Sequence, residues 1–144
     1  MEFDPAEKAI EYFGKIQSMI NKDIGEVLRA RARTLPGMIE SVGLVPSLSF
    51  CYGKATNKTL EKVKKAWECW ANSKIEVKKE EGGYAIYLLL SLLYLKDLGI
   101  ISNEEIKEPI KVFKKILTKE SITARLLMPY LIEVKRLVEA VYGE

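Results

Sequence analysis

Few side chains in this sequence are suited to covalent or acid–base catalysis. The chain contains no histidine, so the commonest general base and the commonest metal ligand are both missing. A cysteine nucleophile would need such a base, which leaves Cys51 and Cys69 without an activating partner. The adjacent acidic pairs at residues 80–81 and 104–105 point apart in a helix cap or loop, which favours capping over catalysis. The sequence therefore predicts no enzyme, no metal site and no cofactor.

The cysteines and the longest apolar run place limits on the environment of the chain. With no CxxC pair and no recognisable signal peptide, we expect a reduced, cytoplasmic protein in which Cys51 and Cys69 are buried apolar residues. Abundant Lys and Glu beside a single Gln, Gln17, are typical of thermophile proteins, in which intracellular disulfides do form, so a Cys51–Cys69 bond stays open. The apolar run at residues 84–95 is shorter than the roughly 20 residues that span a membrane and predicts a core helix.

The side chains suited to binding are basic. Arg29, Arg31 and Arg33 occur at every second position before a turn-rich segment, and Lys54 follows that segment. On a helix, Arg29 and Arg33 lie one turn apart on an outer face, where both can approach phosphates. Arg31 projects onto the apolar stripe instead, so we expect it to be paired inside the fold or to contact a neighbouring subunit.

Two later segments present further basic faces. A helix over residues 57–71 and a last helix over residues 122–142 each project several charges to one side. The residues on these faces are Lys58, Lys62 and Lys65 in the first case, and Arg125, Pro129, Ile132 and Arg136 in the second. A solvated surface is the simplest interpretation of any charge run. The face that mixes Pro and Ile with two arginines fits contact with protein or nucleic acid better.

Composition indicates one globular unit. A chain of 144 residues with 48% apolar residues is the usual size and make-up of a single domain, which we expect to cover residues 1–144. A net charge of +3 permits an anionic partner, although any strongly basic patch must be local. Helical periodicity dominates and no convincing alternating strand is present. We therefore predict an all-α fold, a single-domain bundle of about six helices with a short-helix corner at residues 35–55.

The first half of this bundle is predicted to contain one long helix and the corner. The long helix runs from Pro5 to about Arg33. In the corner, Pro36 starts a short helix that Gly43 ends with a left-handed residue, and Pro46 starts another. The apolar residues expected in the core here are Ala9, Phe13, Ile16, Ile20, Ile24, Val27, Met38, Ile39, Leu48 and Phe50. On this prediction, Phe50→Ala would cost about 3–5 kcal/mol.

The second half is predicted to be helical except for one exposed loop. The expected helices span residues 57–71, 84–98, 102–119 and 122–142, with the loop over residues 72–83, where two glycines interrupt any period. Gly99 ends the apolar helix, Ser102 and Glu105 form a capping box for the next, and Pro109 bends it. The residues expected in the core are Leu60, Val63, Trp67, Trp70, Ile106, Ile110, Phe113, Leu117, Leu127, Leu131, Val134, Val138 and Val141.

The corner also resembles a known family signature. RTLPGMIESVGLVPSLSFCYGK is similar to the signature of the small α-helical subunit of type III-B CRISPR effectors, the Cmr complex. That signature has a basic residue, Leu-Pro, an apolar Met-Ile pair, Gly-Leu, an apolar Leu-x-Phe and a Lys. This chain supplies them in order as Arg33, Leu35, Pro36, Met38, Ile39, Gly43, Leu44, Leu48, Phe50 and Lys54. The resemblance implies a single helical domain.

The resemblance further implies a non-catalytic subunit. Several copies would stack head to tail beside the backbone subunits that hold the guide RNA and would seat the target strand, with no role for a membrane. Guide–target pairing supplies sequence specificity, so phosphate contacts suffice. The candidate RNA-binding residues are Arg29, Arg33, Lys54, Lys58, Lys62, Arg125 and Arg136, and the candidate interface residues are Arg31, Pro129 and Ile132.

Two alternatives to an RNA-seating subunit stay open. A helical adaptor that binds only protein would use the face with Pro129 and Ile132 and leave the lysines to solvent. A DNA-binding helix-turn-helix protein would need a recognition helix beginning VPSLSF at residue 45, which is too apolar to read base edges.

Overall fold

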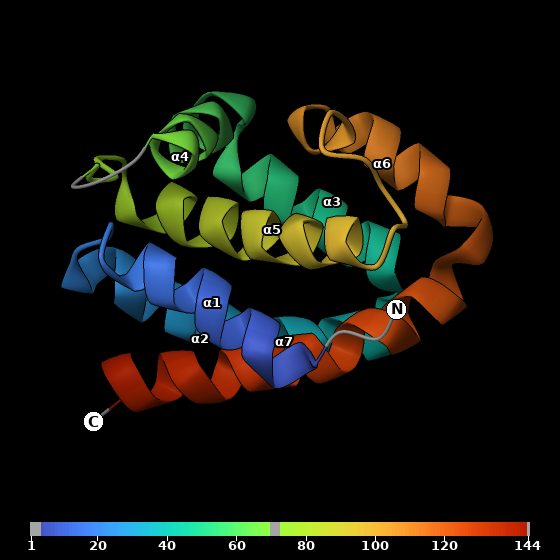
Figure 1. Ribbon diagram of the computed structural model, residues 1–144, viewed down its shortest axis with the longest axis horizontal. Helices are drawn as coiled ribbons and strands as arrows, with labels where there is room; N and C mark the ends of the chain where they lie inside the picture. The colour runs from blue at the N-terminus through green and yellow to red at the C-terminus, as the bar shows by residue number, and fades with distance from the viewer. Residues whose placement is uncertain (1–3, 70–72, 144) are drawn as a thin grey trace.

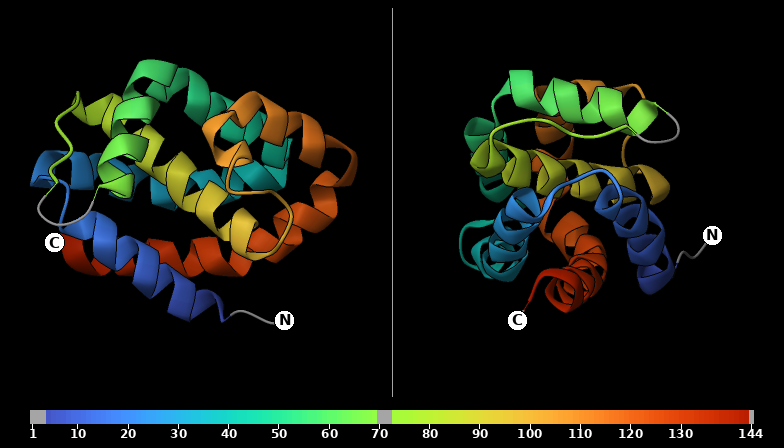
Figure 2. Two further views of the ribbon diagram at one scale, coloured as in Figure 1. Left: turned by 45° about the horizontal axis from the view of Figure 1, so that its top comes forward. Right: turned by 90° about the vertical axis from the view of Figure 1, so that its left-hand side faces the viewer.

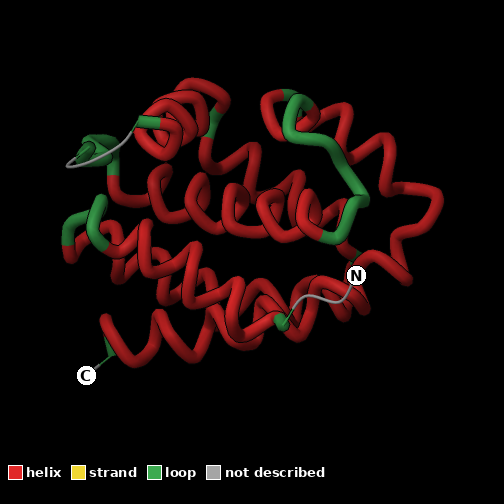
Figure 3. Tube along the Cα trace, viewed as in Figure 1, coloured by secondary structure: helices red, strands yellow, loops and turns green. Residues whose placement is uncertain are grey.

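A computed structural model describes residues 4–69 and 73–143, and their regular structure is entirely helical (Figures 1 and 3), which confirms the all-α class. The α-helices are α1 (Pro5–Gln17), α2 (Lys22–Val42), α3 (Leu44–Ala55), α4 (Asn57–Glu68), α5 (Lys79–Asp97), α6 (Pro109–Ile116) and α7 (Glu120–Tyr142). Two 3₁₀ turns, η1 (Glu105–Lys107) and η2 (Leu117–Lys119), flank α6. In the described part of the chain, no helix is both long and apolar enough to cross a membrane.

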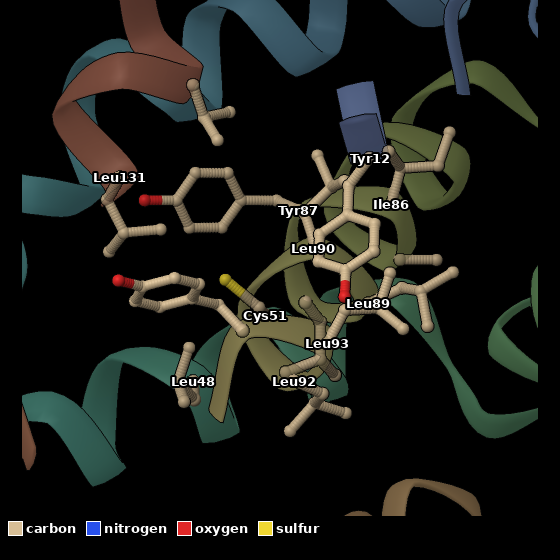
Figure 4. Close-up of a cluster of buried hydrophobic side chains, with 14 of the residues drawn as sticks. Tyr12, Leu48, Cys51, Ile86, Tyr87, Leu89, Leu90, Leu92, Leu93 and Leu131 are labelled. Carbon is tan, nitrogen blue, oxygen red and sulfur yellow. The ribbon is translucent and has the colours of Figure 1, made fainter. Parts of the chain in front are cut away.

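Helix α5 is the centre of the bundle. It lies between α4 on one side and α1, α2 and α7 on the other (Figures 1 and 2). Every residue from 82 to 95 is buried, as expected for a helix that is apolar on all sides. Its side chains meet residues of α1, α3 and α7 in one core (Figure 4). The labelled members of that core are Tyr12, Leu48, Cys51, Ile86, Tyr87, Leu89, Leu90, Leu92, Leu93 and Leu131.

The end of α5 was predicted correctly and its start was not. Gly99 has φ +76°, its N–H donates to the Lys96 carbonyl, and the next N–H, of Ile100, donates to the Leu95 carbonyl, which closes the helix as a Schellman motif. The helix begins at Lys79, so residues 79–83 are not the predicted loop. Residues 70–72, including Trp70, lie outside the described residues.

The glycines that suggested a loop allow α2 to approach α5. A β-carbon built on Gly83 would lie 2.3 Å from Val27 Cγ1 and 3.1 Å from the backbone nitrogen of Leu28. Glycine at this position is therefore required by close helix packing, although it lowers helix propensity by about 1 kcal/mol relative to Ala.

The predicted single helix over residues 5–33 is wrong, because the chain breaks between α1 and α2. Asn21 caps α2, and its Oδ1 accepts a hydrogen bond from the Ile24 N–H at 2.8 Å. The Met19 carbonyl, inside the break, accepts from the Ile75 N–H at 2.8 Å. The apolar spacing of Ile16, Ile20 and Ile24 continues across the break, which is why periodicity alone did not reveal it.

The predicted corner is confirmed at Gly43 and wrong at Pro36. Pro36 lies inside α2, which continues to Val42. Gly43 then has φ 104° and separates α2 from α3, whose first turn contains Pro46. Glu120 of α7 fixes this turn, because its Oε2 accepts a hydrogen bond from the Val45 N–H at 2.6 Å. The corner is thus one sharp turn and one short helix.

Burial at the corner differs from the prediction at one aromatic residue. Ile39 and Leu48 are buried and Met38 is partly buried, but Phe50 is 38% exposed. The buried face of α3 contains Leu44, Ser47, Leu48, Cys51 and Ala55. Phe50 projects beside that face, where its ring packs edge-on against Tyr84 at a centroid distance of 5.7 Å. The predicted loss of 3–5 kcal/mol in Phe50→Ala is therefore too large.

The predicted helix over residues 102–119 is divided. The capping box forms, with the Ser102 N–H donating to Glu105 Oε1 at 2.7 Å, but it caps only η1. Pro109 does not bend a helix, because it occupies the first turn of α6. This later start changes which residues face the core, so the predicted burial of Ile110 and Leu117 is wrong, as it is for Val141 in the last turn of α7. These three residues are exposed, whereas Ile106, Phe113, Leu127, Leu131, Val134 and Val138 are buried as predicted.

Candidate nucleic-acid and protein interfaces

Arg29 and Arg33 converge on a carboxylate of α7. Arg29 Nε donates to Glu139 Oε2 at 2.9 Å, and Arg33 Nη2 lies 3.3 Å from Glu139 Oε1. The hydrogen bond from Arg29, together with both positive charges, lowers the pKa of Glu139. Arg33 is the more exposed of the two side chains, at 51% against 26% for Arg29. A phosphate that approached this pair would therefore compete with Glu139, chiefly for Arg33.

Arg31 points into the fold, as its place on the apolar stripe predicts. Its Nη1 donates to the Tyr84 hydroxyl at 2.6 Å, and the centre of the guanidinium lies 5.0 Å from the Tyr84 ring centroid. Its Nε is buried and has no hydrogen-bond partner among the described residues. Arg31 thus ties α2 to α5, and its predicted contact with a neighbouring subunit stays a prediction.

Lys58 and Lys62 lie together in a small cleft, which we call the α4 lysine cleft. It has a volume of about 230 Å³ and is also lined by Thr56, Thr59, Val77, Lys78 and Glu81. Thr56, at φ 68°, caps α4 by accepting a hydrogen bond from the Thr59 N–H at 3.3 Å. The ammonium groups of these three lysines make no hydrogen bond or ion pair with the residues that the structure describes.

Sequence reasoning missed Lys78 because it precedes α5 in a segment without a period. Lys54 lies in the last turn of α3 and does not line the α4 lysine cleft. Its Nζ lies 5.6 Å from the Phe50 ring centroid, and the residue is exposed.

Arg125, Pro129 and Ile132 line one open groove between α7 and the end of α2, which we call the α7 groove. Its volume is about 620 Å³. Apolar walls are added by Ile39, Ala124 and Met128. Arg136 does not line the groove and instead makes an ion pair of 2.6 Å with Glu133. The structure therefore brings together most of the predicted apolar and arginine face.

The two cysteines and the acidic side chains do not form a shared site in the described residues. Cys51 is buried, which raises the pKa of its thiol to about 12, whereas Cys69 is exposed. Both cysteines are free, so the disulfide that the sequence left open is not formed. Within residues 4–69 and 73–143, no three Cys, Asp or Glu side chains cluster in a way that could hold a metal ion.

In the described residues, a helical bundle combines basic faces with an apolar groove. The family model of the CRISPR-associated protein Cas_Cmr5 matches residues 3–141. The chain therefore belongs to the Cmr5 family, the small subunit of the type III-B CRISPR effector called the Cmr complex, as the signature in the corner indicated.

Individual relatives agree with this assignment. The CRISPR system CMR subunit Cmr5 of Saccharolobus solfataricus is 27% identical over 139 residues, which cover 92% of this chain and 89% of that protein. A chain of the type III-B Cmr-beta complex bound to non-cognate target RNA matches with a TM-score of 0.88 and 23% identity, over 98% of this chain and 97% of that chain. A chain of the Cmr-beta complex bound to cognate target RNA and AMPPnP matches with a TM-score of 0.85 and 22% identity, over 97% of both chains. These two solved structures share the fold.

Proposed function

We propose that this protein is a non-catalytic subunit of a type III-B effector complex that helps to seat the target RNA strand. Several copies stack head to tail beside the subunits that hold the guide RNA, and each copy contacts backbone phosphates. Membership of the Cmr5 family supports this proposal, as does the likeness to chains solved within Cmr complexes bound to target RNA. Base readout is unnecessary, because the guide supplies specificity by pairing.

The α4 lysine cleft is the observation that carries the RNA contact. Lys58, Lys62 and Lys78 line one concave surface together with a single carboxylate, Glu81, which accepts a hydrogen bond from the Thr59 hydroxyl and forms no ion pair with the three lysines. Three lysines against one carboxylate leave an excess of positive charge, and a concave surface with such an excess focuses the electrostatic potential and attracts counterions. A phosphate bound there would release those counterions, which is the main source of affinity for a nucleic-acid backbone.

The arginines make a secondary contribution in this proposal. Glu139 neutralises part of the charge of Arg29 and Arg33, so these residues add less to RNA affinity than their number suggests. Lys54 extends the basic surface beyond the cleft at the end of α3. Arg136 adds a separate basic group on α7, where Glu133 offsets part of its charge.

The α7 groove is proposed as the contact with a neighbouring subunit. It combines apolar walls with Arg125, and the exposed Pro129 and Ile132 lie on its surface. Interface centres are enriched in arginine and in well-packed apolar side chains. The same groove is the observation that favours the alternative function, a protein-only adaptor, so RNA binding and assembly must be tested separately.

The RNA contact is tested with the double variant Lys58→Ala, Lys62→Ala in the reconstituted complex. Each lost phosphate contact should reduce the slope of log affinity against log salt by about 0.7, or about 1.4 for both. Target affinity should therefore fall most at low salt. The control is Lys111→Ala, Lys114→Ala, which removes the same charge from the exposed face of α6. An adaptor would show unaltered affinity and slope in the first variant, and a pure effect of net charge would appear equally in both.

The subunit contact is tested with Ile132→Asp, which places a carboxylate on the α7 groove. Ile132 is 38% exposed, so the isolated protein should remain folded, as shown by its melting temperature. Its incorporation into the complex, measured by subunit stoichiometry after gel filtration, should fall. The matched control is Ile110→Asp on α6, at a residue that is 69% exposed and does not line the groove. Normal incorporation of Ile132→Asp would contradict the proposed contact.

A further inference from the structure

Four lysines from separate parts of the chain meet in a pocket that includes none of the candidate residues above. Lys15 of α1, Lys64 of α4, Lys96 of α5 and Lys107 of η1 line a volume of about 370 Å³, which we call the lysine pocket. Glu68 is the carboxylate among the lining residues, and Asn103 adds a side-chain amide. Positive charge is therefore concentrated where α1, α4, α5 and η1 meet.

Two of these ammonium groups are fixed by the walls of the pocket. Lys64 is only 5% exposed, and its Nζ donates to the Ile106 carbonyl at 3.1 Å and lies 3.2 Å from Glu61 Oε1. Lys15 Nζ donates to the Trp67 carbonyl at 2.6 Å and lies 4.0 Å from the Trp67 ring centroid. A nearly buried ammonium is costly unless it is held by partners, so these contacts define a built site rather than a solvated surface.

The other two lysines are available to a ligand. The ammonium groups of Lys96 and Lys107 make no hydrogen bond or ion pair with the residues that the structure describes. Glu61 beside Lys64 and Glu68 in the lining offset part of the charge of the four lysines, and the remaining positive charges repel one another across a partly enclosed volume whose low-dielectric walls strengthen that repulsion. An anion in the pocket would remove the repulsion and accept hydrogen bonds from Lys96, Lys107 and the Asn103 amide.

We propose that the lysine pocket binds a phosphate group. Its volume is at the lower end of the range of about 300–1,000 Å³ that is usual for small-molecule pockets, which suits a phosphate with part of a nucleotide. One face of Trp67 is occupied by Lys15, so recognition rests on the phosphate rather than on base stacking. The phosphate belongs either to a free nucleotide or to the end of an RNA chain.

This site is separate from the proposed RNA-seating surface. Lys64 follows Lys62 by two residues, which places the two side chains about 200° apart around α4. The α4 lysine cleft and the lysine pocket therefore open on different sides of the same helix, and variants of one leave the other intact. Loss of target-strand seating in the assembled complex would not remove phosphate binding by the isolated chain, so the two proposals fail independently.

The test measures binding to the isolated protein by calorimetry, at constant ionic strength in chloride. The probes are inorganic phosphate, AMP, and one short RNA carrying either a 5′-phosphate or a 5′-hydroxyl. The double variant Lys96→Ala, Lys107→Ala should weaken binding by at least about 10-fold, because each lysine supplies a charge-assisted hydrogen bond. The control is Lys114→Ala, an exposed lysine on α6 that does not line the pocket. Circular dichroism verifies that all variants are folded.

Each outcome decides the proposal. If phosphate and AMP bind to the parent and the control but not to the double variant, the result supports a free nucleotide as the source of the phosphate. Binding restricted to the 5′-phosphorylated RNA, with the same response to the variants, supports an RNA end. The proposal is overturned if no probe binds, if the 5′-hydroxyl RNA alone binds, or if the control and the double variant lose affinity equally.

Discussion

The close approach of α2 and α5 makes Gly83→Ala a sensitive test of the fold. A β-carbon at this position would lie 2.3 Å from Val27 Cγ1, 2.8 Å from Val27 Cβ and 3.1 Å from the Leu28 nitrogen. The valine side chain has one strongly preferred rotamer in a helix and the backbone nitrogen cannot rotate away, so the two helices must separate. Such overpacking costs about 1–3 kcal/mol. The gain from replacing a helical glycine with alanine is about 0.5–1 kcal/mol.

The packing cost therefore exceeds the propensity gain. We expect Gly83→Ala to be less stable than the parent by about 1–2 kcal/mol, which lowers the melting temperature by about 2–8 °C for a chain of this size. The assay is thermal unfolding followed by circular dichroism, with urea unfolding as an independent measure.

Gly14→Ala is the matched control, because a β-carbon on this exposed residue inside α1 meets no atom within 4 Å. Propensity acts alone there, so the variant should be more stable by about 0.5–1 kcal/mol. The prediction is thus a difference in sign between two chemically identical substitutions. If Gly83→Ala were as stable as the parent, or shifted in parallel with Gly14→Ala, α2 and α5 could not be packed as described.

Three further outcomes follow from burial and charge. Leu48→Ala, at a fully buried site, should cost about 2–5 kcal/mol and Phe50→Ala only about 1–2 kcal/mol in urea unfolding, and equal losses would contradict the exposure of the aromatic ring. The hydrogen bond from Arg29 of α2 lowers the pKa of Glu139. The ionised Glu139 carboxylate therefore stabilises the fold at pH values above the ordinary glutamate pKa of about 4.3, and this stabilisation is lost as the pH falls through the lowered pKa. The difference in melting temperature between the parent and Glu139→Gln should be full at neutral pH and shrink below about pH 4.3, and a constant difference would count against the ion pair. Cys69 should react with a thiol reagent in the native protein, whereas Cys51 should react only on unfolding, as peptide mass spectrometry would reveal.

Sequence periodicity predicted the parts of the fold in which local preference and burial agree. The apolar run of α5 is buried on all sides, so no register had to be chosen, and Gly99 supplied an unambiguous end. The predicted boundaries failed where a cap broke a helix without changing the apolar spacing, and where a proline lies inside a helix instead of starting one. α1 ends at Gln17 and Asn21 caps the start of α2, while the spacing of the isoleucines continues across the break. Pro36 carries a strong start signal, yet packing of α2 against α5 and α7 keeps the helix continuous through it.

The sequence correctly predicted which candidate residues lie together when those residues belong to the same helix. Lys58 with Lys62, and Pro129 with Ile132, each come together because residues three or four positions apart lie on one helix face. Glu139 could not be assigned to Arg29 in this way, because the two residues are separated by 110 positions and meet only through the packing of α2 on α7. Electrostatic partners of this kind depend on topology, which a helical pattern does not contain.

The position of Lys64 shows that some polar contacts inside the fold can be detected from the sequence. It lies four residues after Leu60 and three before Trp67, on the apolar stripe of α4, as Arg31 lies on the apolar stripe of α2. Burying a charge on an apolar stripe requires a fixed partner. Arg31 has the Tyr84 hydroxyl, and Lys64 has the Ile106 carbonyl and Glu61. The two residues have different roles. Arg31 joins two helices of the core, whereas Lys64 lines a pocket together with three other lysines. A basic residue on an apolar stripe therefore indicates a polar contact inside the fold, and the basic groups that the fold brings beside it decide whether that contact also forms a ligand site.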